Sequence, residues 1–184
     1  KYKDLKVSHD QIKAIVKAAS LAPLAKNRQP WKYLVYEGKA KEELLSAMER
    51  GLEREKKEHC LLPGSAFALP GAFQTLSIMR KAPVTIIVMD PDGRSPYEPV
   101  NADERLAEIC DYLSIGASIQ NMLLKATQLG LGTLWIANTC FAYNDMVEVI
   151  PSKGQLIGAV AVGYAAEKPY PRPRKKLEEI LEYM

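Results

Sequence analysis

Two carboxamide side chains, Asn27 and Gln29, lie one residue apart in a short polar segment that also contains Pro23 and Pro30. Prolines restrict the backbone, and each carboxamide offers two N–H donors and one carbonyl acceptor. A restrained loop of this kind suits a planar ligand whose edge alternates donors and acceptors. The same side chains could instead only brace the backbone of their own loop. Residue types and spacing leave both interpretations open.

A second candidate site lies near the C-terminus, in the run 168–176, where Arg172 and Arg174 alternate with prolines. The prolines hold this run extended, so the two arginines would project to one side and could grip one phosphate group. A solvated basic tail explains the same residues equally well. The pair therefore indicates a phosphate contact only as one of two interpretations.

Composition argues against several other classes of protein. The 184 residues include 25 basic and 22 acidic side chains, too small an excess to indicate nucleic-acid binding, and aromatic residues do not interleave with the basic tail. No segment reaches the roughly 18 apolar residues of a membrane helix, and no signal peptide begins the chain. We expect one cytoplasmic domain over residues 1–184 that binds no metal. No disulfide or metal-ligand spacing relates the cysteines and histidines, which are Cys60, Cys110, Cys140, His9 and His59.

The candidate loop is expected to join a helix to a strand. Ser8 and Gln11 have the spacing of a capping box, and apolar residues from Ile12 to Ala19 follow at helical spacing, which predicts a helix over 8–21. Residues 32–36, Lys-Tyr-Leu-Val-Tyr, are mostly apolar or aromatic, which predicts a strand. The loop 22–31 would thus be held at both ends.

The longest periodic segment runs from 101 to 129. Asn101 and Glu104 again have capping-box spacing, and Gly130 is the expected stop. About 28 residues at about 1.5 Å each give a helix of roughly 40 Å, longer than one small domain needs for its own core. The small residues among 114–118 would let another backbone approach closely. We expect this helix to lie at a dimer seam, and a tight crossing inside one chain is the alternative.

The remaining pattern predicts strands over 84–89, 131–137 and 156–162, an exposed amphipathic helix over 40–60, and a short helix over 141–150 that starts near Asn144 or Asp145. Residues 61–80 are too irregular to assign, and the amphipathic segment Leu177–Tyr183 should dock on another surface. No Gly-x-Gly-x-x-Gly follows the first strand, which argues against a Rossmann domain. A layered α+β fold fits better.

The loop also carries a resemblance to a known family. Residues 22–31, Ala-Pro-Leu-Ala-Lys-Asn-Arg-Gln-Pro-Trp, resemble the Ala-Pro-Ser-x-x-Asn-x-Gln-Pro-Trp motif of the FMN-dependent nitroreductases. Gln120–Ala126 with Leu129–Trp135 looks like the family's long central helix and the turn after it. Gly163-Tyr164 resembles the end of the family's last strand, and the basic run 171–175 resembles the basic segment that follows it. Leu24 stands where the family has serine, so a hydroxyl contact to the flavin is lost.

The resemblance implies a fold and an activity. The fold would be nitroreductase-like, with a central, mostly antiparallel sheet flanked by helices and the long helix at a homodimer interface. The activity would be ping-pong transfer of hydride from NADH or NADPH, through FMN, to a small electron-poor acceptor such as a nitroaromatic or a quinone. The flavin would carry the chemistry, so no catalytic side chain is expected. A flavin-binding storage or regulatory protein without turnover is the alternative.

The resemblance also implies which segments contact the flavin. Asn27 and Gln29 would line it across the dimer seam, and the backbone of 134–136 would face the isoalloxazine edge. The family's Arg-Arg-Ser-x-Arg stretch, which holds the flavin phosphate, is not among these residues, so this arm either precedes Lys1 or is missing. In the variable region, Gln74 would bond to the ring or, as a loop glutamine, face water. The full set of implied contacts is Pro23, Leu24, Ala25, Asn27, Gln29, Gln74, Leu134, Trp135, Ile136, and, at the phosphate, Arg172 and Arg174.

Overall fold

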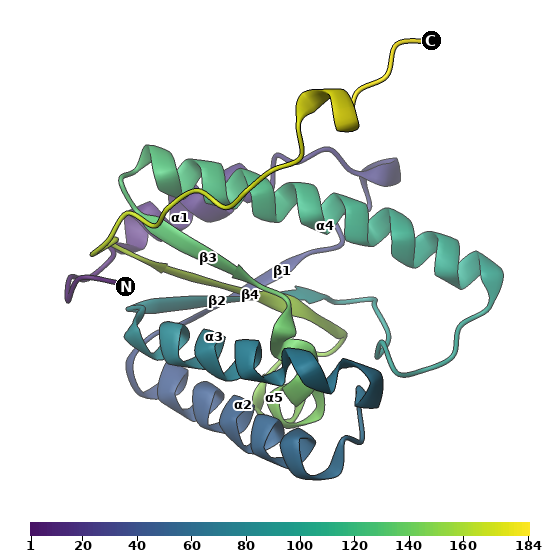
Figure 1. Ribbon diagram of the computed structural model, residues 1–184, viewed down its shortest axis with the longest axis horizontal. Coiled ribbons are helices and arrows are strands. Elements are labelled where there is room, and N and C mark those ends of the chain that lie inside the picture. Colours follow the sequence, from purple (N-terminus) through teal and green to yellow (C-terminus); the bar gives the residue numbers. More distant parts are fainter.

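The fold is a single antiparallel sheet with helices on both faces, as a computed structural model of residues 1–184 shows (Figure 1). The strand order is β1-β2-β4-β3, so β1 and β3 are the two edges. This architecture confirms the predicted α+β fold with an antiparallel central sheet. The strands are β1 (Lys32–Tyr36), β2 (Val84–Asp90), β3 (Gly132–Ile136) and β4 (Gln155–Gly163).

The helices form two layers (Figure 1). One face of the sheet is covered by α1 (His9–Ala19) and α4 (Ala102–Gln128). The other is covered by α2 (Gly38–Glu58), α3 (Leu69–Lys81) and α5 (Tyr143–Val149). Each layer buries its own apolar cluster against the sheet. Strand β2 contributes to both clusters and is buried throughout, which explains why its sequence is mostly apolar, apart from Thr85 and Asp90, rather than alternating.

Local signals located the helix ends correctly. Ser8 and Asn101 each form the complete capping box that the spacing predicted, at the starts of α1 and α4. Gly130 has φ +73, the left-handed conformation that suits glycine after a helix. The long helix is therefore real, and it runs for 27 residues without a break.

The structure adds detail to three segments. Residues 61–80 are regular: they form a 3₁₀ helix, Pro63–Ala68, and then α3, whose Pro70 lies in the first turn, where proline is tolerated. Helix α5 begins at Tyr143, inside the predicted range 141–150 and one residue before Asn144, and the Asp145 carboxylate in its first turn accepts hydrogen bonds from Arg54 of α2. The segment 177–183 is exposed on its own chain and extends away from the body of the molecule (Figure 1), so its docking on another surface stays a prediction.

No helix of this fold is both long and apolar enough to cross a lipid bilayer.

Candidate functional site

The loop 22–31 has an unusual backbone. Lys26, Asn27 and Gln29 have φ angles of 51°, 54° and 51°, in the left-handed region. Residues with a β carbon enter this region at a cost of roughly 1–2 kcal/mol each, and such conformations cluster at ligand sites. The side chains of Asn27 and Gln29 are exposed and form no hydrogen bond within the chain. Neither carboxamide braces its own loop through a hydrogen bond, and both are free to contact a ligand.

An ion pair holds the middle of this loop against α4. Arg28 donates from Nε to Asp111 Oδ1 at 3.0 Å and from Nη2 to Asp111 Oδ2 at 2.8 Å. The hydrogen bonds and the negative charge of Asp111 raise the pKa of Arg28, which stays charged. The Asp111 side chain is 5% exposed and that of Arg28 is 45% exposed. A two-bond pair with one partner buried is more rigid than a surface ion pair. The sequence analysis missed both residues.

Two further contacts fix the segments on either side of the loop. Asn121 Nδ2 donates to the carbonyl oxygen of Ala18, near the end of α1, at 3.3 Å. The hydroxyl groups of Ser118 and Tyr33 are hydrogen-bonded, which ties α4 to β1 just after the loop. On α4, Ser118 lies seven residues after Asp111 and Asn121 lies ten after it, which is about two and three turns. One face of α4 thus anchors the loop before, within and after its ligand-facing residues.

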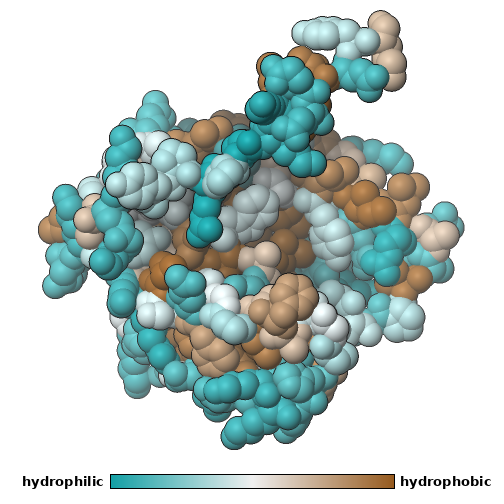
Figure 2. All heavy atoms as spheres, viewed as in Figure 1, coloured by the Kyte–Doolittle hydropathy of each residue, from teal (hydrophilic) through white to brown (hydrophobic).

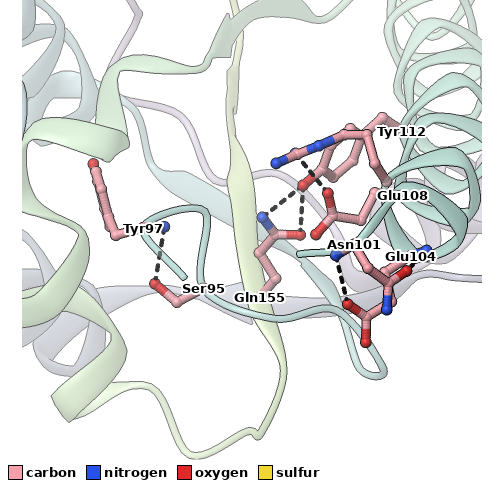
Figure 3. A network of polar contacts seen from close by, with 8 residues as sticks. Ser95, Tyr97, Asn101, Glu104, Glu108, Tyr112 and Gln155 are labelled. Carbon is pink, nitrogen blue, oxygen red and sulfur yellow. Dashed lines mark hydrogen bonds and ion pairs between the residues drawn. The ribbon is translucent and has the colours of Figure 1, made fainter. Parts of the chain in front are cut away.

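Helix α4 is in turn attached to the sheet. Tyr112 reaches from α4 to Gln155 at the start of β4 (Figure 3), with Gln155 Nε2 donating to the tyrosine oxygen at 2.8 Å and the tyrosine hydroxyl facing Oε1 at 3.1 Å. Nearby, burial raises the pKa of Asp90 at the end of β2, and the charge of Asp111 adds to that effect. The frame that holds the loop therefore includes the sheet as well as the helix.

Strand β3 presents a free edge. None of Leu134, Trp135 and Ile136 makes a backbone hydrogen bond to any element other than β4. Every second N–H and C=O along an edge strand points away from its only neighbour, so this edge can accept the hydrogen-bonding edge of a ligand. The Trp135 side chain is 45% exposed and lies beside Gly116 of α4, where an added β carbon would be 4.0 Å from its ring.

The loop and the end of β3 lie at the same end of the sheet but on opposite edges. Three strand spacings separate β1 from β3, about 14 Å in all. A cavity of about 220 Å³ lies between the loop and α4, lined by Ala25, Lys26 and Arg28 among others. Ligand pockets usually measure roughly 300–1,000 Å³. This cavity includes no residue of β3, so it does not join the loop to the strand edge.

Gln74 lies on a helix, not in the predicted loop. It is exposed on α3, next to Thr75, whose hydroxyl accepts a hydrogen bond of 3.0 Å from Asn138 Nδ2. Asn138 follows β3 by two residues. The structure therefore brings this turn of α3 to the end of β3. A separate cavity of about 410 Å³ between α2 and α3 includes none of the predicted contacts.

The two tail arginines, Arg172 and Arg174, are exposed. Arg174 Nη1 donates to the carbonyl oxygens of Arg172 and Pro173, at 3.2 and 3.1 Å, so its guanidinium folds onto the tail itself. The segment that carries them passes in front of α4 in the view of Figure 1. The predicted phosphate contact of the two arginines stays a prediction.

Comparisons with known proteins agree on a family. Residues 1–164 match the Nitroreductase family. Spy0809 of Streptococcus pyogenes, provisionally named an NAD(P)H nitroreductase, is 25% identical over 190 residues, which cover 98% of this chain and 92% of that protein.

Two solved structures share the fold. A BluB-like flavoprotein from Clostridium difficile 630 superimposes with a TM-score of 0.74, 22% identity and coverage of 100% of this chain and 93% of that chain. The FMN and NADPH-dependent nitroreductase NfnB from Sphigopyxis sp. strain HMH has a TM-score of 0.76, 17% identity and coverage of 100% and 92%. Since the family match spans most of the chain, the sequence resemblance is confirmed, and this protein belongs to the nitroreductase family.

Proposed function

We propose that this protein is an FMN-dependent oxidoreductase, active as a homodimer, that takes hydride from NADH or NADPH and delivers it to a small electron-poor acceptor. Family membership and the cofactors in the names of its relatives support the reaction class. Nitroaromatics and quinones are the acceptor classes we propose, with donor and acceptor occupying the same place in turn.

One observation carries the proposal: the two loop carboxamides are exposed, unpaired and held in a left-handed backbone. An Asn and a Gln together offer four donors and two acceptors to the edge of a planar ring. The polar edge of an isoalloxazine has the matching alternation. The Arg28–Asp111 pair keeps these groups in place before a ligand binds, so less conformational entropy is lost on binding. The residues present therefore fit FMN.

The other contacts follow from the same geometry. The unpaired backbone edge of Leu134–Ile136 would meet a different edge of the ring, and Gln74 lies on α3, which Thr75 links to Asn138 just after that strand. Pro23, Leu24 and Ala25 would lie against the ring. Arg172 and Arg174 would pair with the phosphate once the tail is ordered by it. When bound, FMN supplies the hydride chemistry, and the protein supplies binding, orientation and shielding from water.

The exposed apolar face of α4 supports the homodimer. Leu106, Ile109, Leu113 and Leu124 share one side of the helix and are 62%, 46%, 70% and 60% exposed. Figure 2 shows hydrophobic atoms over the part of the surface that the first half of α4 occupies, at the right of the view. Exposed apolar stripes of this kind mark interaction sites. A second copy would place its own loop beside the free edge of β3 and so close the gap that one chain leaves open.

The proposal is tested by mixing the purified protein with FMN and NADPH under nitrogen. Loss of the flavin absorbance, followed by its return when menadione or a nitroaromatic is added, supports the enzyme. Absence of any flavin binding at saturating FMN would contradict it. The same experiment also tests a second candidate, a flavin carrier without turnover. The presence of Leu24 where the family motif has serine favours this candidate. A carrier would bind FMN and leave it oxidised.

A further inference from the structure

We infer that Asp111 is a positioning residue for the cofactor: by holding Arg28 it keeps Asn27 and Gln29 in their left-handed, ligand-facing conformation. The inference rests on the proposed function, since the ligand of those carboxamides is taken to be FMN. Asp111 does not itself reach the ligand face, because its side chain is 5% exposed and both of its oxygens are occupied by Arg28.

The argument starts from the strain in the loop. Lys26, Asn27 and Gln29 adopt φ angles that side chains disfavour, so the loop would relax toward other conformations unless something outside it prevented this. Within residues 22–31, Arg28 is the only residue whose side chain makes a hydrogen bond to another part of the chain. The strained residues lie on both sides of it. Release of Arg28 would therefore free both carboxamides at once.

The burial of Asp111 makes the pair selective for one geometry. A buried carboxylate costs free energy unless its oxygens are paired, and here the forked guanidinium pairs both. A lysine at position 28 would keep the positive charge but could not satisfy both oxygens from one direction. Asp90 and Asp92 add negative potential at the Arg28 guanidinium without bonding to it. The negative charge would attract any cation at this position, but only the forked guanidinium of arginine fixes the loop.

The chain offers a matched control. Asp145 on α5 is also buried and also pairs both oxygens with one half-exposed arginine, Arg54 of α2. This second pair joins two helices on the opposite face of the sheet and touches none of the predicted flavin contacts. Replacing Asp145 by Asn therefore costs stability of the same kind without affecting the loop.

The test compares Asp111→Asn, Arg28→Lys and Asp145→Asn with the unmodified protein in two assays. The first is the FMN dissociation constant from flavin fluorescence. The second is the rate of tryptic cleavage after the exposed Lys26 in the absence of flavin. We expect the first two variants to weaken FMN binding about tenfold and to speed the cleavage, because one charge-assisted bond is lost and the loop opens. We expect Asp145→Asn to change neither by more than about twofold.

The outcomes separate this inference from the proposed function. Unchanged affinity and cleavage in both Asp111→Asn and Arg28→Lys would overturn the positioning role, as would an equal effect in Asp145→Asn. If Asp111→Asn does not fold, Arg28→Lys alone decides, since Arg28 is half-exposed and leaves a cation near Asp111. If the unmodified protein binds no FMN, the proposed function fails, and the tryptic assay still shows whether the pair holds the loop.

Discussion

The carbonyl oxygen of Ile136 on β3 lies against Gly158 on β4 so closely that a β carbon on the glycine would be 2.5 Å from it. The oxygen belongs to the backbone, so it can move away only if the end of β3 moves. Ile136 is also one of the three residues whose outer edge we propose to face the flavin. The position of the end of β3 thus depends on a glycine of the neighbouring strand.

Gly158→Ala is therefore expected to destabilise the protein by about 1–3 kcal/mol, as overpacking against backbone does, and to weaken FMN binding. Urea unfolding monitored by circular dichroism measures the first effect and flavin fluorescence the second. Gly71→Ala is the control, because Gly71 lies on α3 with open space around its position. Equal unfolding free energies of the two variants would show that the end of β3 moves away from the added methyl group without cost, which would contradict this prediction.

The carboxamides are tested by Asn27→Gly and Gln29→Gly. Glycine keeps the left-handed backbone accessible, so the substitutions remove the side chain without adding strain. Each is expected to weaken FMN binding by roughly tenfold, the value of about one good hydrogen bond in a dry site, while the melting temperature changes little. Because neither side chain bonds within the chain, a large fall in melting temperature with unchanged FMN affinity would mean that they serve the loop instead.

The proposed dimer is tested by Leu113→Glu, which places a charge in the middle of the apolar face of α4. Leu113 is 70% exposed in the single chain, so the substitution should not affect the fold of the monomer. We expect size-exclusion chromatography with light scattering to show a monomer, with weaker FMN binding as a consequence. Val149→Glu, a similar change at a 40% exposed residue of α5, should remain dimeric. If the Leu113→Glu variant remains dimeric, the interface lies elsewhere on the protein.

Residues 60–62, which follow α2, are held in place by one buried carboxylate, that of Glu55. Glu55 is 1% exposed and accepts from the backbone N–H groups of Leu62 and Leu61, at 2.8 and 2.9 Å, and from the Cys60 thiol at 3.3 Å. Burial alone would raise the pKa of Glu55, but these donors outweigh it and hold the pKa below its usual range. The charged form is therefore favoured by folding.

Glu55→Gln should accordingly cost on the order of 1–3 kcal/mol near pH 7. A lowered folded-state pKa contributes stability above the unfolded value of about 4.3, and this stability is lost as pH falls through the folded value. The difference in unfolding free energy between the two proteins should thus shrink below about pH 4. Urea unfolding at several pH values between 3 and 7 provides the comparison, and a difference that grows on acidification would contradict this role of Glu55.

Local patterns were enough to locate most of the elements. The capping boxes at Ser8 and Asn101 and the stop at Gly130 depend on residues within a few positions of one another, so their spacing alone marks the helix ends. The β-branched run of β2 predicts a buried strand for the same reason. The loop motif around Asn27 and Gln29 pointed to the family without any tertiary contact.

Tertiary structure decided what short-range patterns could not contain. The Arg28–Asp111 pair joins residues 83 positions apart, and the free edge of β3 follows from strand order rather than from its own sequence. Asp145 does not cap α5, and its carboxylate is paired with Arg54, 91 positions away. Burial and long-range charge depend on which segments the fold brings together. This is why Asp111, one of several polar residues in a helical run, showed its role only when α4 was placed against the loop.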